Sequence, residues 1–229
     1  MNKLLLSTYT KHAAATLDKQ IHLNGMIDGL EFEYRQQPGE IAFGDEYVWN
    51  TQVLGTESES TSTWLWGWAN GASGVLDESL VMVRKLQKLG KDQGIEELVT
   101  PEIPFEEFDG NFWSVIGTGL CNAAAYFRIP NADGALYVAI KDANFKQNTD
   151  RSLARLATVF PQAIAAFPMK NHISALKGYV DYLGLKIGVE GKGLFVADDS
   201  GGRLVAQFDE RKRLAKLKGS LAKAEDSGK

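Results

Sequence analysis

Three tryptophans spaced two residues apart, Trp64, Trp66 and Trp68, have the clearest potential for binding chemistry. Successive side chains of a strand point to opposite faces, so the three indoles would share one face of a strand. That face could stack a planar ligand, a sugar ring or a partner's side chain. Alternatively the rings are core, because each buries on the order of 200 Å² and soluble monomers rarely expose so large an apolar patch. We favour the core interpretation and keep the binding surface as a hypothesis.

Tyr126 and Arg128 lie at the end of an apolar run that starts at Ile116 and stops before Pro130. Arg128 could bind an anionic ligand, because a guanidinium fork pairs with carboxylate or phosphate. Alternatively it is a base at a helix C-terminus, where it stabilises the helix dipole and the last carbonyls. The candidate ligand-binding residues are therefore Trp64, Trp66, Trp68, Tyr126 and Arg128.

Catalytic groups could also converge from distant positions. Carboxylates between Glu102 and Asp109 could work with His172 as the acid and base of a hydrolase or transferase. Local motifs do not support this, because the sequence has no phosphate-binding loop, nucleophile elbow or dinucleotide fingerprint. His12, His22 and His172 are too widely spaced for a metal site, so we expect no metal and no cofactor. Whether the protein is an enzyme stays open, and we lean towards a non-catalytic protein.

The composition is that of an ordinary globular protein, with 44% hydrophobic and 24% charged residues in a chain of 229. Its 25 Lys and Arg against 29 Asp and Glu give a net charge of −4, so we expect no nucleic acid and no acidic membrane as partner. Residues 209–229 are locally basic. A single cysteine, Cys121, and a start without the apolar core of a secretion signal lead us to expect a cytoplasmic protein.

Hydrophobic periodicity predicts the elements of the first part of the chain. A helix is expected over residues 4–23, followed by four short strands in an antiparallel meander, because only short turns separate them. Helical spacing returns from Leu76, and a deeply buried helix is expected from Phe112 to Phe127. A strand follows over residues 136–140. The four strands of the meander are expected near residues 30–34, 41–43, 47–53 and 64–68.

The second part is expected to hold helices over 153–167 and 173–183, divided by Pro168, and then a second meander of strands. A basic helix from Asp209 to about Ala224 would end the fold, with acids in its first turn. The fold class is α+β, with antiparallel meander sheets packed with helices and a helix at each terminus. We expect one compact domain over 1–229, which could divide into halves of about 1–143 and 144–224, with a frayed tail at 225–229.

The chain resembles an uncharacterised bacterial family, a domain of unknown function, whose hallmark is a T-W-x-W-x-W-A-N strand. The stretches that carry the resemblance are Leu54-Gly55-Thr56-Glu57-Ser58, then Thr63 to Asn70, then Ala125-Tyr126-Phe127-Arg128-Ile129-Pro130 leading into the strand near 135–140. The resemblance covers about residues 20–142. It implies a shared α+β fold and brings no activity, cofactor or catalytic residue.

Three hypotheses of function follow. The first is a non-catalytic cytoplasmic protein that binds a small molecule or a protein partner through an aromatic groove flanked by Arg128. The second is a hydrolase or transferase whose site is assembled from sequence-distant residues. The third is a structural or immunity-type protein that works through its surface. The sequence predicts no oligomeric state.

Overall fold

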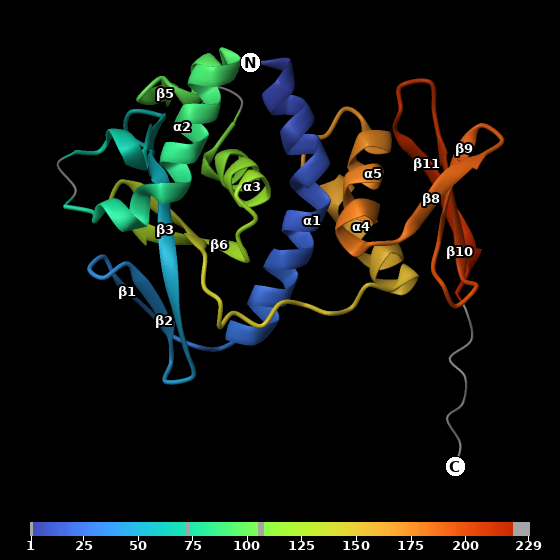
Figure 1. Cartoon of the computed structure of the whole chain (residues 1–229), viewed down its shortest axis with the longest axis horizontal. Helices are drawn as coiled ribbons and strands as arrows, with labels where there is room; N and C mark the ends of the chain where they lie inside the picture. Colours follow the sequence, from blue (N-terminus) through green and yellow to red (C-terminus); the bar gives the residue numbers. More distant parts are fainter. Residues whose placement is uncertain (1, 72–73, 105–107, 222–229) are drawn as a thin grey trace. The chain divides into compact units, whose positions relative to one another are not determined.

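A computed structural model describes residues 2–71, 74–104 and 108–221 of the chain. The chain forms two compact units (Figure 1). Unit 1 comprises residues 1–9 and 19–148, and unit 2 comprises residues 10–18 and 149–229. The N-terminal helix α1 (Lys3–Ile27) therefore gives residues to both units. It begins where the Asn2 side chain accepts a hydrogen bond from the Leu4 N–H at 2.8 Å.

Unit 1 is built on a seven-stranded antiparallel sheet around one long strand, β3 (Tyr47–Ser58). Residues 47–50 of β3 pair with β2 (Glu40–Phe43), which pairs with β1 (Phe32–Arg35). In this part Phe32, Phe43 and Tyr47 lie opposite one another, so their side chains share one face of the sheet.

The second half of β3 pairs on one side with β4 (Thr63–Trp66) and on the other with β7 (Gly134–Ile140). Beyond β4 lies β5 (Glu102–Pro104), and beyond β7 lies β6 (Ala125–Asn131). All these pairs are antiparallel, which confirms the predicted α+β fold with antiparallel sheets and a helix at the N-terminus.

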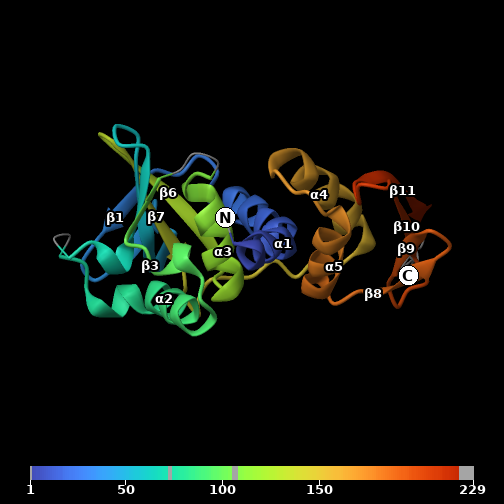
Figure 2. The same cartoon turned by 90° about the horizontal axis from the view of Figure 1, so that it is seen from above.

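Helices α2 (Val81–Gln93) and α3 (Gly110–Leu120) lie against β3 (Figures 1 and 2). Asp109 caps α3, because its Oδ1 accepts the Phe112 N–H at 3.2 Å. Among the helices that the structure describes, none is long and apolar enough to cross a membrane. The described residues of unit 1 also contain three short 3₁₀ turns: η1 (Gly67–Ala69), η2 (Asp77–Leu80) and η3 (Glu96–Leu98).

Unit 2 combines residues 10–18 of α1 with α4 (Leu153–Ala166), α5 (His172–Leu183) and a four-stranded antiparallel sheet. The sheet order is β11-β10-β9-β8, so β8 and β11 are its edges. The strands are β8 (Lys186–Glu190), β9 (Gly193–Ala197), β10 (Arg203–Phe208) and β11 (Leu214–Ser220). The buried side chains of this sheet are Leu194, Val196, Leu204 and Ala206.

The predicted C-terminal helix from Asp209 to about Ala224 is wrong for the residues described, because β11 stands there; residues 222–224 lie outside them. Asp209 forms a hairpin turn, in which its Oδ1 accepts the N–H groups of Arg211 and Arg213 at 2.9 and 2.8 Å. Lys212 has a φ of 62°, which interrupts a helix. Pairing with β10 outweighs the helical charge pattern.

The predicted helix from Phe112 to Phe127 is too long, because α3 ends at Leu120 and β6 starts at Ala125. Asn122 adopts a φ of 48° just after α3, which stops the helix. Aromatic residues that follow pair well in a sheet, and β6 pairs with β7. Arg128 therefore lies in a strand and not at a helix C-terminus.

Candidate functional site

The predicted common face of the three tryptophans is interrupted after Trp66, because β4 ends there and Trp68 lies in a 3₁₀ turn. Trp64 and Trp66 have no exposed surface, whereas Trp68 is half-buried. The rings of Trp64 and Trp66 meet edge to face with centroids 5.5 Å apart. The Trp64 indole lies over Gly55, where an added Cβ would stand 2.4 Å from the ring. Trp64 and Trp66 thus pack as core side chains of unit 1.

Tyr126 and Arg128 are two residues apart in β6, so their side chains lie on the same face of the sheet. Tyr126 is buried, and its hydroxyl donates to the Asn111 side-chain oxygen at 3.1 Å. Arg128 is exposed and stands 3.8 Å from a Glu59 carboxylate oxygen. In the β6–β7 pairing Arg128 lies opposite Tyr137, so the two predicted residues join a third aromatic that the sequence reasoning did not single out.

Glu57 connects this face to the start of α3. Its Oε2 accepts the Tyr137 hydroxyl at 2.9 Å and the Gly110 N–H at 3.0 Å. Gly110 allows this approach, because a Cβ there would stand 2.3 Å from the Tyr137 ring. We call this group the tyrosine–carboxylate cluster; its members are Glu57, Asp109, Asn111, Tyr126 and Tyr137.

The hydroxyls of the cluster stay protonated at physiological pH. Burial raises the pKa of Tyr126 far above its ordinary value, and the nearby Asp109 charge adds to the effect. For Tyr137, burial again raises the pKa most, followed by the hydrogen bond to Glu57. These tyrosines can donate hydrogen bonds but cannot serve as bases. Because the cluster bonds to Gly110 and Asn111, the first residues of α3, it holds the start of that helix in place.

The carboxylates and the histidine proposed as acid and base belong to different units of the structure. Glu102 lies in β5 and accepts the Thr63 hydroxyl at 2.7 Å, and Asp109 caps α3; Glu106 and Glu107 lie outside the described residues. His172 belongs to unit 2, where one ring nitrogen faces the Met169 carbonyl and the other accepts the Leu214 N–H. Both nitrogens of His172 are therefore committed to the backbone.

Cys121 is half-buried, and burial raises the pKa of its thiol, so it lacks the thiolate character of a nucleophile. Within residues 2–71, 74–104 and 108–221, no three His, Cys, Asp or Glu side chains come together in a way that could hold a metal ion.

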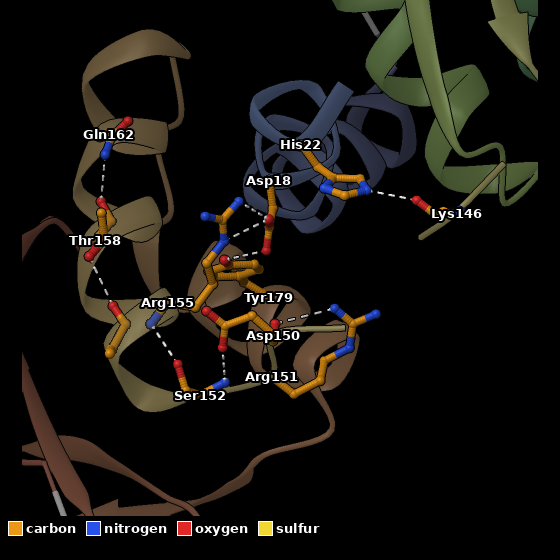
Figure 3. A network of polar contacts seen from close by, with 11 residues as sticks. Asp18, His22, Lys146, Asp150, Arg151, Ser152, Arg155, Thr158, Gln162 and Tyr179 are labelled. Carbon is orange, nitrogen blue, oxygen red and sulfur yellow. Dashed lines mark hydrogen bonds and ion pairs between the residues drawn. The ribbon is translucent and has the colours of Figure 1, made fainter. Parts of the chain in front are cut away.

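Unit 2 has a buried polar network centred on Asp18 (Figure 3). Asp18 has no exposed surface. Its Oδ1 accepts two hydrogen bonds from Arg155, at 2.9 and 2.6 Å, and its Oδ2 accepts the Tyr179 hydroxyl at 2.7 Å. The network joins α1, α4 and α5 within unit 2, and local sequence patterns could not find it, because its members lie more than 130 residues from Asp18.

Aromatic side chains reach the surface of unit 1 where β1 and β6 meet. Phe32 is 40% exposed and contacts Phe127 edge to face, with ring centroids 5.1 Å apart. Phe127 in turn contacts Phe43 at 5.0 Å, and Tyr47 lies opposite Phe43 on the same face. Phe43 itself is buried in the core, and Tyr47 and Phe127 are half-buried, so Phe32 is the exposed member of the group. We call Phe32, Phe43, Tyr47 and Phe127 the aromatic seam.

Four exposed carboxylates lie close in the chain to residues of the aromatic seam, before β1 and in the turn between β2 and β3. Glu31 precedes Phe32, and its carbonyl accepts the Gly44 N–H at 2.9 Å, which brings the turn at Asp45 and Glu46 beside it. Asp28 lies in the loop before β1. In the part of the chain that the structure describes, none of these four carboxylates forms an ion pair or a hydrogen bond. We call Asp28, Glu31, Asp45 and Glu46 the carboxylate rim.

The sequence reasoning missed the aromatic seam. The alternation of Phe32 and Tyr34 is a strand signal, but the contact with Phe127 depends on how the sheet brings two of its edge strands, β1 and β6, together. Phe32 and Phe127 are 95 positions apart in the sequence, and no local periodicity of hydrophobic residues can predict such a contact.

Comparison with protein families matches residues 7–143 to a family of unknown function. The match includes α1 from residue 7 and all the strands of unit 1, and it agrees with the resemblance to a domain of unknown function seen in the sequence. Searches of curated proteins and of solved structures find no match to this chain. Because the family model covers more than half of the residues, the protein belongs to this family of unknown function, DUF6882.

Proposed function

We propose that unit 1 is a recognition module that binds a basic segment of a partner protein through the aromatic seam and the carboxylate rim. The observation that carries the proposal is the exposed ring of Phe32, 40% accessible, together with four exposed carboxylates of the neighbouring loops that form no ion pair in the described residues. Aromatic faces attract ammonium and guanidinium groups, and carboxylates pair with the same groups. An exposed aromatic surface with such a rim is typical of a protein interaction site.

The charge of unit 1 supports a cationic partner. Unit 1 has ten Lys and Arg against nineteen Asp and Glu, a net charge of −9. The negative electrostatic potential of such a unit speeds the association of a cationic partner and repels the phosphates of a nucleic acid. A small amine would satisfy only the rim, whereas a peptide segment also uses the apolar rings.

The single cysteine supports a reducing compartment for this activity, such as the cytoplasm. Cys121 is a free, half-buried thiol, and secreted proteins more often pair or lack such thiols.

The test uses a fluorescein-labelled peptide of alternating Lys and Leu, with a Glu and Leu peptide as the negative probe. We expect fluorescence anisotropy to show binding of the Lys peptide and none of the Glu peptide. Phe32→Ser should weaken binding about tenfold, because it removes the exposed aromatic contact. The double variant Asp45→Lys with Glu46→Lys should weaken binding at least as much, because it reverses half of the rim.

Two matched controls separate this site from general attraction to an acidic protein. Val48→Ser removes an apolar side chain that is 49% exposed, on the opposite face of the same pairing, where Val48 lies opposite Ala42. Glu78→Lys with Glu96→Lys changes the net charge by the same amount, away from the seam. Equal loss of binding in the controls and in the seam variants would overturn the proposal.

A further inference from the structure

The edge strand β8 of unit 2 leaves apolar side chains uncovered. Among the strands that the structure describes, it pairs only with β9, in an unbroken register from Lys186 to Glu190. Val189 is 77% exposed and Ile187 is 37% exposed. Natural edge strands are protected by prolines, bulges or inward charges, because an open edge pairs with other chains. β8 has no proline and no bulge, and its two charged residues, Lys186 and Glu190, lie at its ends, so the backbone between them is open to another strand.

The turn after β8 shows which backbone groups face this free edge. Glu190 and Gly193 are paired across a two-residue turn, and Gly191 has a φ of 56° there. In such a hairpin the carbonyl of the first residue bonds to the N–H of the fourth, so the backbone of Glu190 points towards β9. Because the direction alternates along a strand, Lys186 and Gly188 also point towards β9. The N–H and C=O groups of Ile187 and Val189 therefore point outward.

The sequence of β8 is complementary to itself when it is read in the opposite direction. With Gly188 placed opposite Gly188 of a second copy, Ile187 faces Val189 and Lys186 faces Glu190, twice each. In this register the outward groups of Ile187 and Val189 form the hydrogen-bonded pairs, and the glycines form the non-bonded pair between them. Side chains directly opposite share a face, so both charge pairs lie on one face and both apolar pairs on the other.

The charges beside β8 extend the match. Lys186 already contacts Asp199 at 2.5 Å, and Glu190 contacts Arg203 at 2.9 Å. Pairing of the two strands would place these contacts in one row on the outer face, in the order Asp199, Lys186, then Glu190 and Arg203 of the second copy. Charges along that row alternate in sign, which favours this partner over a strand of unrelated sequence.

On the opposite face of β8 a groove of about 520 Å³ lies beside α5. Its apolar lining residues are Val180, Leu185 and Ile187, and its polar ones are Lys11, Ser174, Lys177 and Asp181. Val189 of the second copy would lie opposite Ile187, on the face of the strand that borders this groove. The side chain that is most exposed in one copy would thus be covered by apolar groups of the other.

We propose that the protein forms a two-fold symmetric dimer in which β8 pairs antiparallel with β8 of a second copy, centred on Gly188. The pairing joins the two four-stranded sheets into one sheet of eight strands. It is an isologous interface, in which the same strand serves both copies.

A charge exchange on the full chain tests the register. In Lys186→Glu, the new Glu faces Glu190 of the second copy at both positions, and in Glu190→Lys two lysines meet. Each variant alone should dimerise about tenfold more weakly than the wild type in sedimentation equilibrium. An equimolar mixture of the two variants should regain the dimer, because both contacts again join opposite charges.

A second measurement reads the contact directly. A zero-length carbodiimide cross-link between Lys186 and Glu190 cannot form within one strand, where the two residues are about 13 Å apart. We expect this cross-link in the wild type, between copies that carry different isotope labels. Val189→Lys should abolish it without unfolding unit 2, because that side chain is already exposed.

Three results would overturn the proposal. One is a wild type that remains a 25.1 kDa monomer at the highest soluble concentration. The second is a dimer that the single charge variants and Val189→Lys leave unchanged. The third is a mixture of charge variants that is no more dimeric than either alone, which would mean that another surface or another strand covers β8.

Discussion

The two units differ in how they satisfy the polar groups that they bury. Unit 2 buries a full charge, Asp18, and satisfies it with Arg155 and Tyr179. Unit 1 buries one ammonium group, that of Lys19, which donates to the Ala123 carbonyl at 2.8 Å. It leaves several neutral polar atoms without a hydrogen-bond partner among the residues described, including the indole nitrogens of Trp64 and Trp113. A buried charge is costly if one partner is removed, whereas a buried indole is held by its large apolar area. Unit 2 therefore depends on a few polar contacts, and unit 1 on aromatic packing.

The units also differ in charge. Unit 2 has fifteen Lys and Arg against ten Asp and Glu, a net of +5, compared with −9 for unit 1. The whole-chain value of −4 hides this division. It follows that an average over the sequence says little about the partner of either unit.

The largest effect is expected from breaking the buried network of unit 2. Asp18→Ala removes the carboxylate and leaves the Arg155 guanidinium and the Tyr179 hydroxyl without their acceptor. We expect a loss of about 3–5 kcal/mol in the free energy of unfolding, measured by denaturant titration. Hydrogen exchange should rise first in α4 and α5, because Arg155 and Tyr179 lie on these helices.

Asp18→Asn is the matched control for this variant. It keeps the size of the side chain and one carbonyl oxygen as an acceptor, and so it should lose less stability than Asp18→Ala. If both variants unfold like the wild type, the network does not stabilise unit 2.

A smaller effect should separate the two buried tryptophans of β4. The Trp66 indole N–H donates to the Glu97 carbonyl at 3.0 Å, whereas that of Trp64 has no partner among the described residues. Trp66→Phe leaves a carbonyl without its donor, so it should destabilise unit 1 by about 1 kcal/mol more than Trp64→Phe. Iodide should quench neither ring, because neither is exposed.

A reversed order of stability in these two variants would show that ring volume, not the hydrogen bond, decides the cost. Iodide quenching that disappears in Trp64→Phe or Trp66→Phe would show that the substituted ring is accessible to solvent, and it would again be a candidate binding residue.

The elements that the sequence predicted well are those whose signal is local. The alternation in β2 and β3 and the helical spacing of α4 and α5 are fixed by neighbours in the chain, and the structure confirms them. The C-terminal strand β11 was missed because its charge pattern favours a helix, and only its pairing with β10 decides for a strand. The aromatic seam and the Asp18 network depend on contacts between residues more than 90 positions apart in the sequence, and local hydrophobic periodicity cannot predict them.

A pH effect of smaller size is expected in unit 2. The Leu214 N–H donates to His172 Nδ1 at 2.9 Å, so this nitrogen must be unprotonated in the folded state. Burial lowers the pKa of His172 below its ordinary value near 6.5, and the Arg213 charge lowers it further, against the Met169 carbonyl and Asp209. Below about pH 6.5, His172 therefore binds a proton in the unfolded chain but not in the folded chain.

Unit 2 should thus lose stability as the pH falls from about 6.5 towards the lowered pKa, and keep it above that range. Denaturant titrations of the wild type at a series of pH values measure this loss. His172→Gln should flatten the curve in that interval, and a curve of unchanged slope would assign the loss to other groups.

The smallest effect is expected from Arg128, the residue that the sequence offered as an anion-binding group. Its ion pair with Glu59 is 3.8 Å long, and the two side chains are 40% and 70% exposed. Exposed pairs of this kind contribute little, so Arg128→Ala and Glu59→Ala should each change the unfolding free energy by no more than about 0.5 kcal/mol. The contrast with Asp18→Ala is the sharpest test of the difference between the units, because both variants break a contact between an arginine and a carboxylate. A cost for Arg128→Ala as large as that for Asp18→Ala would mean that the guanidinium stabilises Tyr137 and Glu57 from outside, and that the tyrosine–carboxylate cluster, rather than aromatic packing, holds unit 1 together.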